Sequence, residues 1–328
     1  MQGDLVTVND CQNSDLFWAL RGGGGGTFGV VVSVTVRTYP EVPTYVAALS
    51  VVASSLSDYQ SVLKEFHTEL TNLNDAGASG YYFMRFGTQS ANSSTPSTLQ
   101  MALLFVNQTD EARVSTLLNP VVETIRNIAG NSSVEYNLFF APQVKLFIEG
   151  SLSGESDETG ALLITGSRLI SRDFLKTADG PTRLTDALAA LAPLAPGSTM
   201  TGHIVAGGQV ARNLGVVDSA LNPAWRKTAT HITFGAVWNF NTPMAVQKSI
   251  AEQITNVAVP KLKVLEPGAM GAYLNEADAN EADWQQTFWG VNYPRLYKMK
   301  QKWDPEGLFI TRLGVGSEDW DADGLCRV

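Results

Sequence analysis

The stretch DLFWALRGGGGGTFGVVVSVTVRTYP, Asp15 to Pro40, decides how this sequence folds. Five consecutive glycines, Gly22 to Gly26, separate a segment with helical spacing from a valine-rich segment that alternates like a strand. Glycine loses more backbone entropy on folding than any other residue, so an ordered run of five needs a reason. We interpret the run as backbone that a ligand approaches closely, with a surface loop as the alternative.

The order of elements around the glycines excludes a dinucleotide fingerprint. That fingerprint needs a strand before the glycines and a helix after them. Here a helix over Asp15–Arg21, capped by Asn13 or Ser14, comes first, and a strand over Phe28–Tyr39 follows. No Gly-Lys-Ser/Thr follows the run either, so it is not a P-loop.

The composition sets limits on the size, partners and compartment of the protein. The chain has 328 residues, 44% hydrophobic and 17% charged, which suits one large or two ordinary domains. A net charge of −9 with scattered basic residues argues against a nucleic-acid partner. No apolar run approaches the ~20 residues of a membrane helix, so no membrane partner is expected.

Strand and helix patterns alternate through the middle of the chain. The predicted strands are Val46–Val52, Tyr81–Phe86, Thr98–Val106, Ala161–Leu169, Met200–Val210 and Thr230–Phe240. The predicted helices are Ser57–Leu73, Asp110–Ile128, Arg183–Leu194 and Met244–Val264. The polar stretch Glu149–Gly160 is predicted to be a loop. This pattern is typical of an α+β fold, an antiparallel sheet with helices on one face.

The last sixty residues are dense in aromatic side chains and predict two short helices. Asp283–Trp289 is the first, and Tyr293–Trp303, with Pro294 in its first turn, is the second. Asp304-Pro305 and Gly307 mark the turn that ends the second helix.

Histidine and cysteine give no catalytic or metal motif. His67, His203 and His231 lie far apart and lack metal-ligand spacing, so we interpret each as a surface or core residue and predict no metal. Cys11 and Cys326 are compatible with a disulfide or with two free thiols.

Three glycosylation sequons favour a secreted glycoprotein. They begin at Asn92, Asn107 and Asn131. The first residues, MQGDLVTVND, lack the pattern of a signal peptide.

Two motifs carry a resemblance to a known family. The glycine stretch resembles the closing segment of the FAD-binding (PCMH-type) domain of vanillyl-alcohol-oxidase-type flavoproteins. The sequence FWGVNYPRLYKMKQKWDPEGLF, Phe288 to Phe309, resembles the C-terminal signature of the berberine-bridge-enzyme-like branch. The chain is most similar to fungal isoamyl-alcohol-oxidase-like proteins, with both motifs in the family's order and spacing.

The resemblance implies a division of the chain. Residues 1–43 would be the C-terminal part of the FAD-binding domain, residues 44–268 a substrate domain with an antiparallel sheet flanked by helices, and residues 269–328 a segment returning to the FAD domain. Cys11 and Cys326 would then lie in one domain. The family's phosphate-binding loop and flavin-attaching His and Cys lie further upstream, so we expect a C-terminal fragment that holds FAD weakly alone, with residues 1–43 partly disordered.

The resemblance also assigns cofactor-binding residues. The segment along the flavin and its ribityl chain would comprise Gly23, Gly24, Gly25, Gly26, Thr27, Phe28, Gly29 and Val30. Asn292 matches an asparagine that hydrogen-bonds near the cofactor, and Tyr293 follows it. A helix cap and a core aromatic are the alternative roles of these two residues.

The candidate catalytic residues lie in GAYLNEAD, Gly271 to Asp278, which matches a family strand facing the flavin. Tyr273 and Asn275 keep the family pattern, while Glu276 stands where many relatives have Tyr or His. Strand alternation would put Tyr273 and Asn275 on one face and Glu276 on the other, so Tyr273 is favoured as the catalytic residue, with a packing role as the alternative.

The candidate substrate-binding residues lie in HIVAGGQVARN, His203 to Asn213, which resembles a family strand that carries a catalytic glutamate. Arg212 stands at that position, which suits an anionic or polyhydroxylated substrate or a surface role. Gln209 is the other polar side chain expected to reach the substrate.

The expected function is a secreted, monomeric FAD-dependent oxidase of an alcohol or carbohydrate C–OH group. A hydride would pass to flavin N5, and O2 would reoxidise the flavin to give H2O2. The alternative is a catalytically silent fragment or binding module without tightly bound cofactor.

Overall fold

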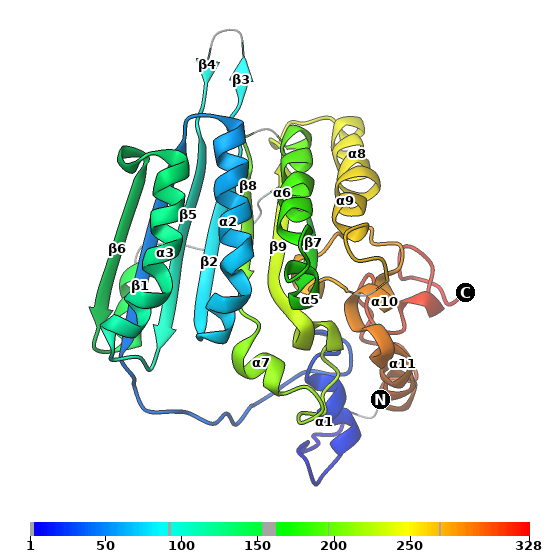
Figure 1. The fold of residues 1–328 in the computed structure, drawn as a ribbon. Coiled ribbons are helices and arrows are strands. Elements are labelled where there is room, and N and C mark those ends of the chain that lie inside the picture. Colours follow the sequence, from blue (N-terminus) through cyan, green and yellow to red (C-terminus); the bar gives the residue numbers. More distant parts are fainter. Residues whose placement is uncertain (1–2, 91–92, 153–161, 196, 269) are drawn as a thin grey trace.

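A computed structural model describes most of the chain and shows a seven-stranded sheet with helices over one face (Figure 1). The described residues are 3–90, 93–152, 162–195, 197–268 and 270–328. The part of the predicted loop from 153 to 160 lies outside them.

Every neighbouring pair of strands in the main sheet is antiparallel, as predicted. Their order across the sheet is β6 (Val134–Ala141), β1 (Thr44–Ala53), β5 (Ser97–Val106), β2 (Ala78–Arg85), β8 (Thr199–Ile204), β9 (Thr228–Val237) and β7 (Leu163–Ser171). A separate small hairpin joins β3 (Gln89–Ser90) and β4 (Ser93–Ser94). The α+β fold class is therefore confirmed.

Long helices cover one face of this sheet (Figure 1). They are α2 (Leu56–Asp75), α3 (Glu111–Ala129), α6 (Gly180–Leu191) and the pair α8 (Met244–Gln253) and α9 (Val259–Lys263). Exposure alternates along β2: Tyr82 and Met84 are fully buried, whereas Tyr81 and Phe83, which alternate with them, are exposed. One face of the sheet is thus a core, and we call the other the open face.

A second, aromatic core joins the two ends of the described chain. Helix α1 (Ser14–Leu20) packs with α10 (Trp284–Trp289) and α11 (Tyr293–Trp303). Trp289 Nε1 donates to the carbonyl of Gly22 at 2.9 Å. The buried ammonium of Lys300 donates to the carbonyl of Thr27 and to Asp304 Oδ2, both at 2.7 Å. The glycine run is therefore fixed to the C-terminal helices, while the proposed domain boundaries stay a prediction.

The expected strand over Phe28–Tyr39 is absent from the structure. This segment runs unpaired from α1 towards β1 (Figure 1), and Val30, Val31, Val32, Val34 and Val36 are exposed. A strand forms only where a neighbour completes its hydrogen bonds, and among the described residues no strand lies beside it. Asn13 occupies the N-cap position of α1 as expected, but it sits at φ 47° and its side chain makes no capping hydrogen bond.

Two further expected strands end early or do not form. Strand β8 stops at Ile204, because Gly207 and Gly208 take positive φ values of 76° and 43° that turn the chain into the short helix α7 (Gly208–Arg212). GAYLNEAD forms no strand either. Gly271 accepts a hydrogen bond from Leu169, Ala272 donates one to Thr287, and a 3-10 turn follows over Leu274–Glu276.

The remaining helices add two smaller differences. Helix α4 (Val144–Leu152) was not expected, and α5 (Arg172–Leu175) is a single turn. The expected helix Met244–Val264 contains a π-helical segment over Ile254–Ala258, two residues before Pro260, which has no N–H for a regular helical bond.

Candidate functional site

A cavity of about 380 Å³ opens beside the glycine run. The run lies next to two other segments there, one around Leu221–Trp225 and one over Ala272–Asn275, with aromatic rings from α10. Its lining consists of Leu20, Gly22, Gly24, Gly25, Gly26, Thr27, Phe28, Gly29, Val31, Leu221, Asn222, Trp225, Ala272, Tyr273, Leu274, Asn275, Phe288 and Trp289. The wall is thus mostly bare backbone and apolar rings, a surface suited to a flat ligand.

The glycines of the run have two different reasons to be glycine. A Cβ at Gly22 would lie 2.2 Å from the backbone nitrogen of Leu221, and a Cβ at Gly23 would lie 2.4 Å from the carbonyl oxygen of Ala19. Both are closed in by protein. A Cβ at Gly25 or Gly29 would meet no atom within 4 Å. These two positions leave space that a ligand can use.

Most residues predicted to contact the cofactor line this cavity. Gly24, Gly25, Gly26, Thr27, Phe28 and Gly29 do so. Gly23 and Val30 do not line it, because Gly23 packs against Ala19 and Val30 points to solvent with 77% of its surface exposed. Gly22, which was not predicted, does line the cavity.

Asn292 and Tyr293 lie behind the cavity wall. Asn292 Nδ2 donates to the carbonyl of Leu221 at 2.9 Å, and the ring of Tyr293 lies 5.6 Å from that of Trp289. Burial and a hydrogen bond to Glu318 raise the pKa of the Tyr293 phenol. Neither residue lines the cavity, but each contacts one that does. A direct contact with the cofactor stays a prediction.

Tyr273 and Asn275 form a hydrogen-bonded pair at the cavity. Asn275 Nδ2 donates to the Tyr273 hydroxyl oxygen at 2.6 Å, and the ring of Trp225 stands edge-on to Tyr273 at 5.8 Å. The 3-10 turn brings the two side chains together, although the strand expected to do so does not exist.

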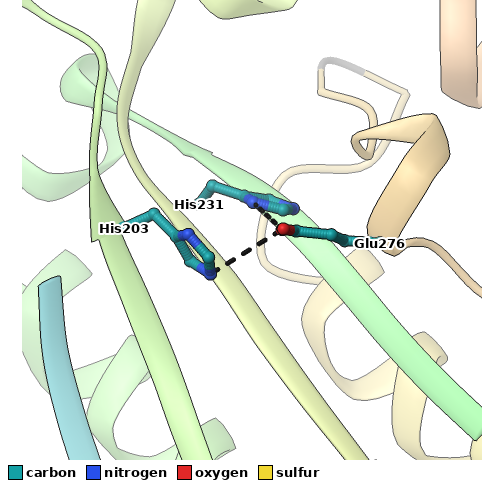
Figure 2. A group of neighbouring side chains, drawn as sticks. All are labelled: His203, His231 and Glu276. Carbon is teal, nitrogen blue, oxygen red and sulfur yellow. Dashed lines mark ion pairs between the residues drawn. The ribbon is translucent and has the colours of Figure 1, made fainter. Parts of the chain in front are cut away.

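Glu276 turns away from this pair and faces two histidines. Figure 2 shows its carboxylate between His203 of β8 and His231 of β9. Glu276 Oε2 lies 3.7 Å from His203 Nε2 and 3.3 Å from His231 Nδ1. His203 and His231 stand directly opposite in the β8–β9 ladder, as do Tyr81 and His203 in the β2–β8 ladder. Tyr81, His203 and His231 therefore share the open face of the sheet.

Both histidines in this group are neutral at pH 7. Burial, with a smaller effect of neighbouring His203, lowers the pKa of His231 to about 3. Burial also lowers the pKa of His203, although the Glu276 carboxylate opposes that shift. The two rings lie 5.1 Å apart, and the Tyr273 ring lies 6.0 Å from His231. The histidine group and the cavity are thus connected through Tyr273.

No motif in the sequence predicts that His203, His231 and Glu276 meet. The interpretation of each histidine as a surface or core residue fits His67, which is fully buried on helix α2. It does not describe His203 and His231, which meet the carboxylate of Glu276. The spacing of the two histidines along the chain does not indicate that they meet. Their meeting follows from the register of β8 and β9, which places them opposite each other.

Gln209 and Arg212 lie on helix α7 and not on a strand as expected. Both are exposed, and Arg212 Nη2 donates to Gln209 Oε1 at 3.2 Å. Neither residue lines the cavity. Their predicted contact with a substrate has no support from this placement.

The two cysteines are not paired. Cys11 and Cys326 are both exposed free thiols, so they form no disulfide in this structure.

Within the described ranges, the helices are too short or too polar to cross a membrane.

Comparison with known proteins links both motifs to one group. The family described as "Berberine and berberine like" matches residues 272–316, which include Tyr273, Asn275 and Glu276. An uncharacterized FAD-linked oxidoreductase of Arthroderma benhamiae is 43% identical over 98% of this chain and 55% of its own length. The flavin-dependent oxygenase ucdF of Aspergillus ustus is 36% identical over 99% of this chain and 58% of its own length.

Solved structures share the fold. The VAO-type flavoprotein MtVAO713 of Myceliophthora thermophila superposes with a TM-score of 0.83 at 27% identity, over 97% of this chain and 56% of its own. A glucooligosaccharide oxidase of Acremonium strictum, at 19% identity and a TM-score of 0.74 over 95% of this chain and 63% of its own, supports the fold alone. The chain thus spans little more than half the length of the curated relatives that it matches.

Proposed function

The chain has the sequence signature and the fold of the C-terminal part of VAO-type, berberine-like FAD-linked oxidoreductases, and from this we infer its function. We propose that the protein containing it is an FAD-linked oxidase. This chain would supply one wall of the flavin site and the surface that holds the substrate. The observation that carries the proposal is the cavity between the glycine run and Tyr273.

The residues at the cavity fit a flavin. Gly25 and Gly29 offer backbone with free space beside it, so a planar ring can lie against the peptide groups. Phe288 and Trp289 offer apolar surface for the same ring. When bound, FAD would supply the hydride acceptor and would pass the electrons on to O2, giving H2O2. The positions expected for the glycine run in the family agree with this placement.

Tyr273 would act on the proton of the substrate hydroxyl. Its oxygen accepts the amide hydrogen of Asn275 at 2.6 Å, and this contact holds the oxygen in place at the cavity. In its phenolate form the tyrosine would accept the hydroxyl proton and become the neutral phenol as the neighbouring C–H bond is oxidised. Asn275 positions the tyrosine oxygen and has no separate chemical role in this scheme.

The open face of the sheet would hold the rest of the substrate. Tyr81 and Phe83 are exposed there, and Phe83 stands directly opposite Thr201. Exposed aromatic rings beside hydroxyl groups suit an alcohol or a sugar ring, which presents apolar C–H faces and polar edges. An alcohol or carbohydrate C–OH group is therefore the proposed substrate class.

The compartment and assembly state belong to the same proposal. Asn107 and Asn131, which begin two of the sequons, are exposed and accessible to glycosylation. A secreted, monomeric glycoprotein is consistent with these positions.

The proposal is tested by filling the cavity at Gly25. Gly25→Leu puts a side chain into free space at the cavity, so we expect flavin content, measured by visible absorbance, to fall at least tenfold. Gly25→Ala is the matched control and should keep most of the flavin. Thermal unfolding of the flavin-free forms should be similar, because the new side chain meets no protein atom.

Two outcomes would contradict the proposal. One is a wild-type protein, purified at full length, that carries no flavin and binds none when FAD is added. That result would favour a catalytically silent binding module. The other is a Gly25→Leu variant with the flavin content of the wild type.

A further inference from the structure

The group of His203, His231 and Glu276 joins three separate parts of the chain at one point on the open face (Figure 2). The ligand-type atoms of the three side chains, two imidazole nitrogens and one carboxylate oxygen, all lie within 4.8 Å of one another. Two histidines and one carboxylate are a frequent donor set for transition metals.

The spacing fits a shared ion better than direct hydrogen bonds. The two His–Glu distances of 3.7 and 3.3 Å exceed the 2.7–3.2 Å range of good N–H···O bonds. Ligands that each lie about 2.0–2.1 Å from a tetrahedral zinc ion stand about 3.4 Å apart. The carboxylate therefore sits at ligand–ligand distance from both nitrogens.

The carboxylate of this group has a buried oxygen without a partner. Glu276 Oε2 makes no hydrogen bond among the described residues. The His231 side chain is only 1% exposed, so its ring has lost most contact with water. Within the described part of the chain, the ion-pair partners of Glu276 are the two histidines, and no Lys or Arg neutralises it.

The charges of the group also agree with ligation. An imidazole binds a metal through the lone pair of its neutral ring. Neutral rings would leave the carboxylate charge uncompensated, and a cation between the three side chains would offset it. His203 Nε2 now shares a hydrogen bond with the Thr233 hydroxyl at 3.1 Å, which ligation would replace.

We propose that His203, His231 and Glu276 bind one divalent transition-metal ion of the zinc type. Imidazole ligands favour such ions over Mg²⁺ and Ca²⁺, which prefer oxygen. Three protein ligands leave at least one coordination position open. Water or an oxygen atom of a substrate would occupy it.

This site goes beyond the proposed oxidase function and does not depend on it. The metal ligands are distinct from the cavity lining, although Tyr273 of that lining packs against His231 at 6.0 Å between ring centres. Metal binding is measured without flavin or turnover, so its failure would leave the oxidase proposal standing, and the reverse also holds.

The test is a titration of the full chain with Zn²⁺ alone. The protein is first treated with a chelator and dialysed, and binding is then followed by calorimetry. Co²⁺ is titrated in parallel, because its visible absorption reports the ligand geometry. We expect one ion per chain and a Co²⁺ spectrum typical of four- or five-fold coordination.

Variants locate the ion at this site. Glu276→Gln keeps the shape but removes the charged ligand, and His203→Gln removes one nitrogen, so each should weaken Zn²⁺ binding at least tenfold. Glu135→Gln is the matched control, because Glu135 is an exposed carboxylate on β6 of the same sheet. It should bind Zn²⁺ like the wild type.

Three results would overturn the proposal: no Zn²⁺ binding by the wild type, unchanged affinity in both ligand variants, or equal loss in the Glu135→Gln control. Thermal unfolding checks that each variant folds. Where a ligand variant does not fold, nuclear magnetic resonance of the wild-type imidazoles decides. Zn²⁺ must shift the signals of His203 and His231 and leave that of His67 unchanged, and any other pattern contradicts the site.

Discussion

A buried histidine lies against each face of the sheet, and the two differ in their partners. His67 on helix α2, which covers one face, and His231 of β9 on the open face are 0% and 1% exposed, and burial lowers the pKa of each to about 3. His67 contacts the hydroxyls of Tyr82 and Thr185, both at 3.4 Å. His231 faces a carboxylate and has one nitrogen without a partner. Burial alone does not distinguish a structural histidine from a functional one, whereas the partners do.

The neighbouring residues Tyr81 and Tyr82 show the same contrast. Strand alternation buries Tyr82 completely in the helix-facing core and leaves Tyr81 46% exposed on the open face. Tyr82 bonds within the core to Thr230 at 3.1 Å, whereas Tyr81 packs against His203 at 5.2 Å. The helix-covered face therefore holds the fold together, and the open face is free for chemistry.

The largest expected effect comes from the helix-covered face. Phe66→Ala removes a fully buried ring that packs on Tyr82 at 4.8 Å. We expect the free energy of unfolding to fall by about 3–5 kcal/mol, as for other buried aromatic residues. Phe83→Ala on the open face should lose much less, because that ring is 41% exposed. Denaturant titration measures both variants, and equal losses of unfolding free energy would contradict the difference between the two faces.

Acid should destabilise the metal-free protein through both buried histidines. Their folded-state pKa is lowered from 6.5 to about 3, so the unfolded chain binds protons that the folded chain does not. The contribution of these two histidines to the free energy of unfolding is fully present above pH 6.5 and is lost as the pH falls from 6.5 towards 3. The slope is at most about 1.4 kcal/mol per pH unit for each histidine.

Denaturant titrations between pH 7 and pH 4 measure this slope. His67→Gln should reduce it, because the buried ring of His67 is gone, and bound Zn²⁺ should change only the part that belongs to its ligands His203 and His231. A stability that does not vary with pH over this range would show that neither ring resists protonation.

The smallest effect on stability, with a large effect on activity, is expected at Tyr273. Tyr273→Phe removes the hydroxyl that accepts from Asn275 at 2.6 Å, one exposed hydrogen bond worth about 1 kcal/mol. Loss of a proton acceptor should lower turnover by about 10²–10⁴-fold. Turnover is measured by oxygen uptake on an alcohol or sugar substrate. Wild-type turnover in this variant would assign Tyr273 to packing.

Local sequence signals predicted the elements that local chemistry determines. Helix α11 begins at Tyr293 and ends at Trp303 as predicted, because Pro294 favours its first turn and Asp304-Pro305 follows its end. Within the glycine run, which we interpret as ligand-facing backbone, Gly22 and Gly23 are closed in by protein atoms, whereas Gly25 has open space beside it. That division depends on contacts with Leu221 and Ala19 and on no pattern within the run.

Features that depend on distant partners were missed. The valines after Gly29 alternate like a strand but lie unpaired, because pairing needs a neighbour that no local pattern supplies. Glu276 points away from Tyr273 and Asn275 as expected, but its meeting with His203 and His231 was not predicted. That meeting depends on the register between β8 and β9, which the spacing of histidines along the chain does not contain.

A crystal structure of the full protein with FAD bound tests directly whether the cavity is the flavin site. We predict that the flavin ring lies in the cavity, against the backbone of Gly25 and with Tyr273 beside it. A ring bound elsewhere, with the cavity between the glycine run and Tyr273 filled only by solvent, would contradict it.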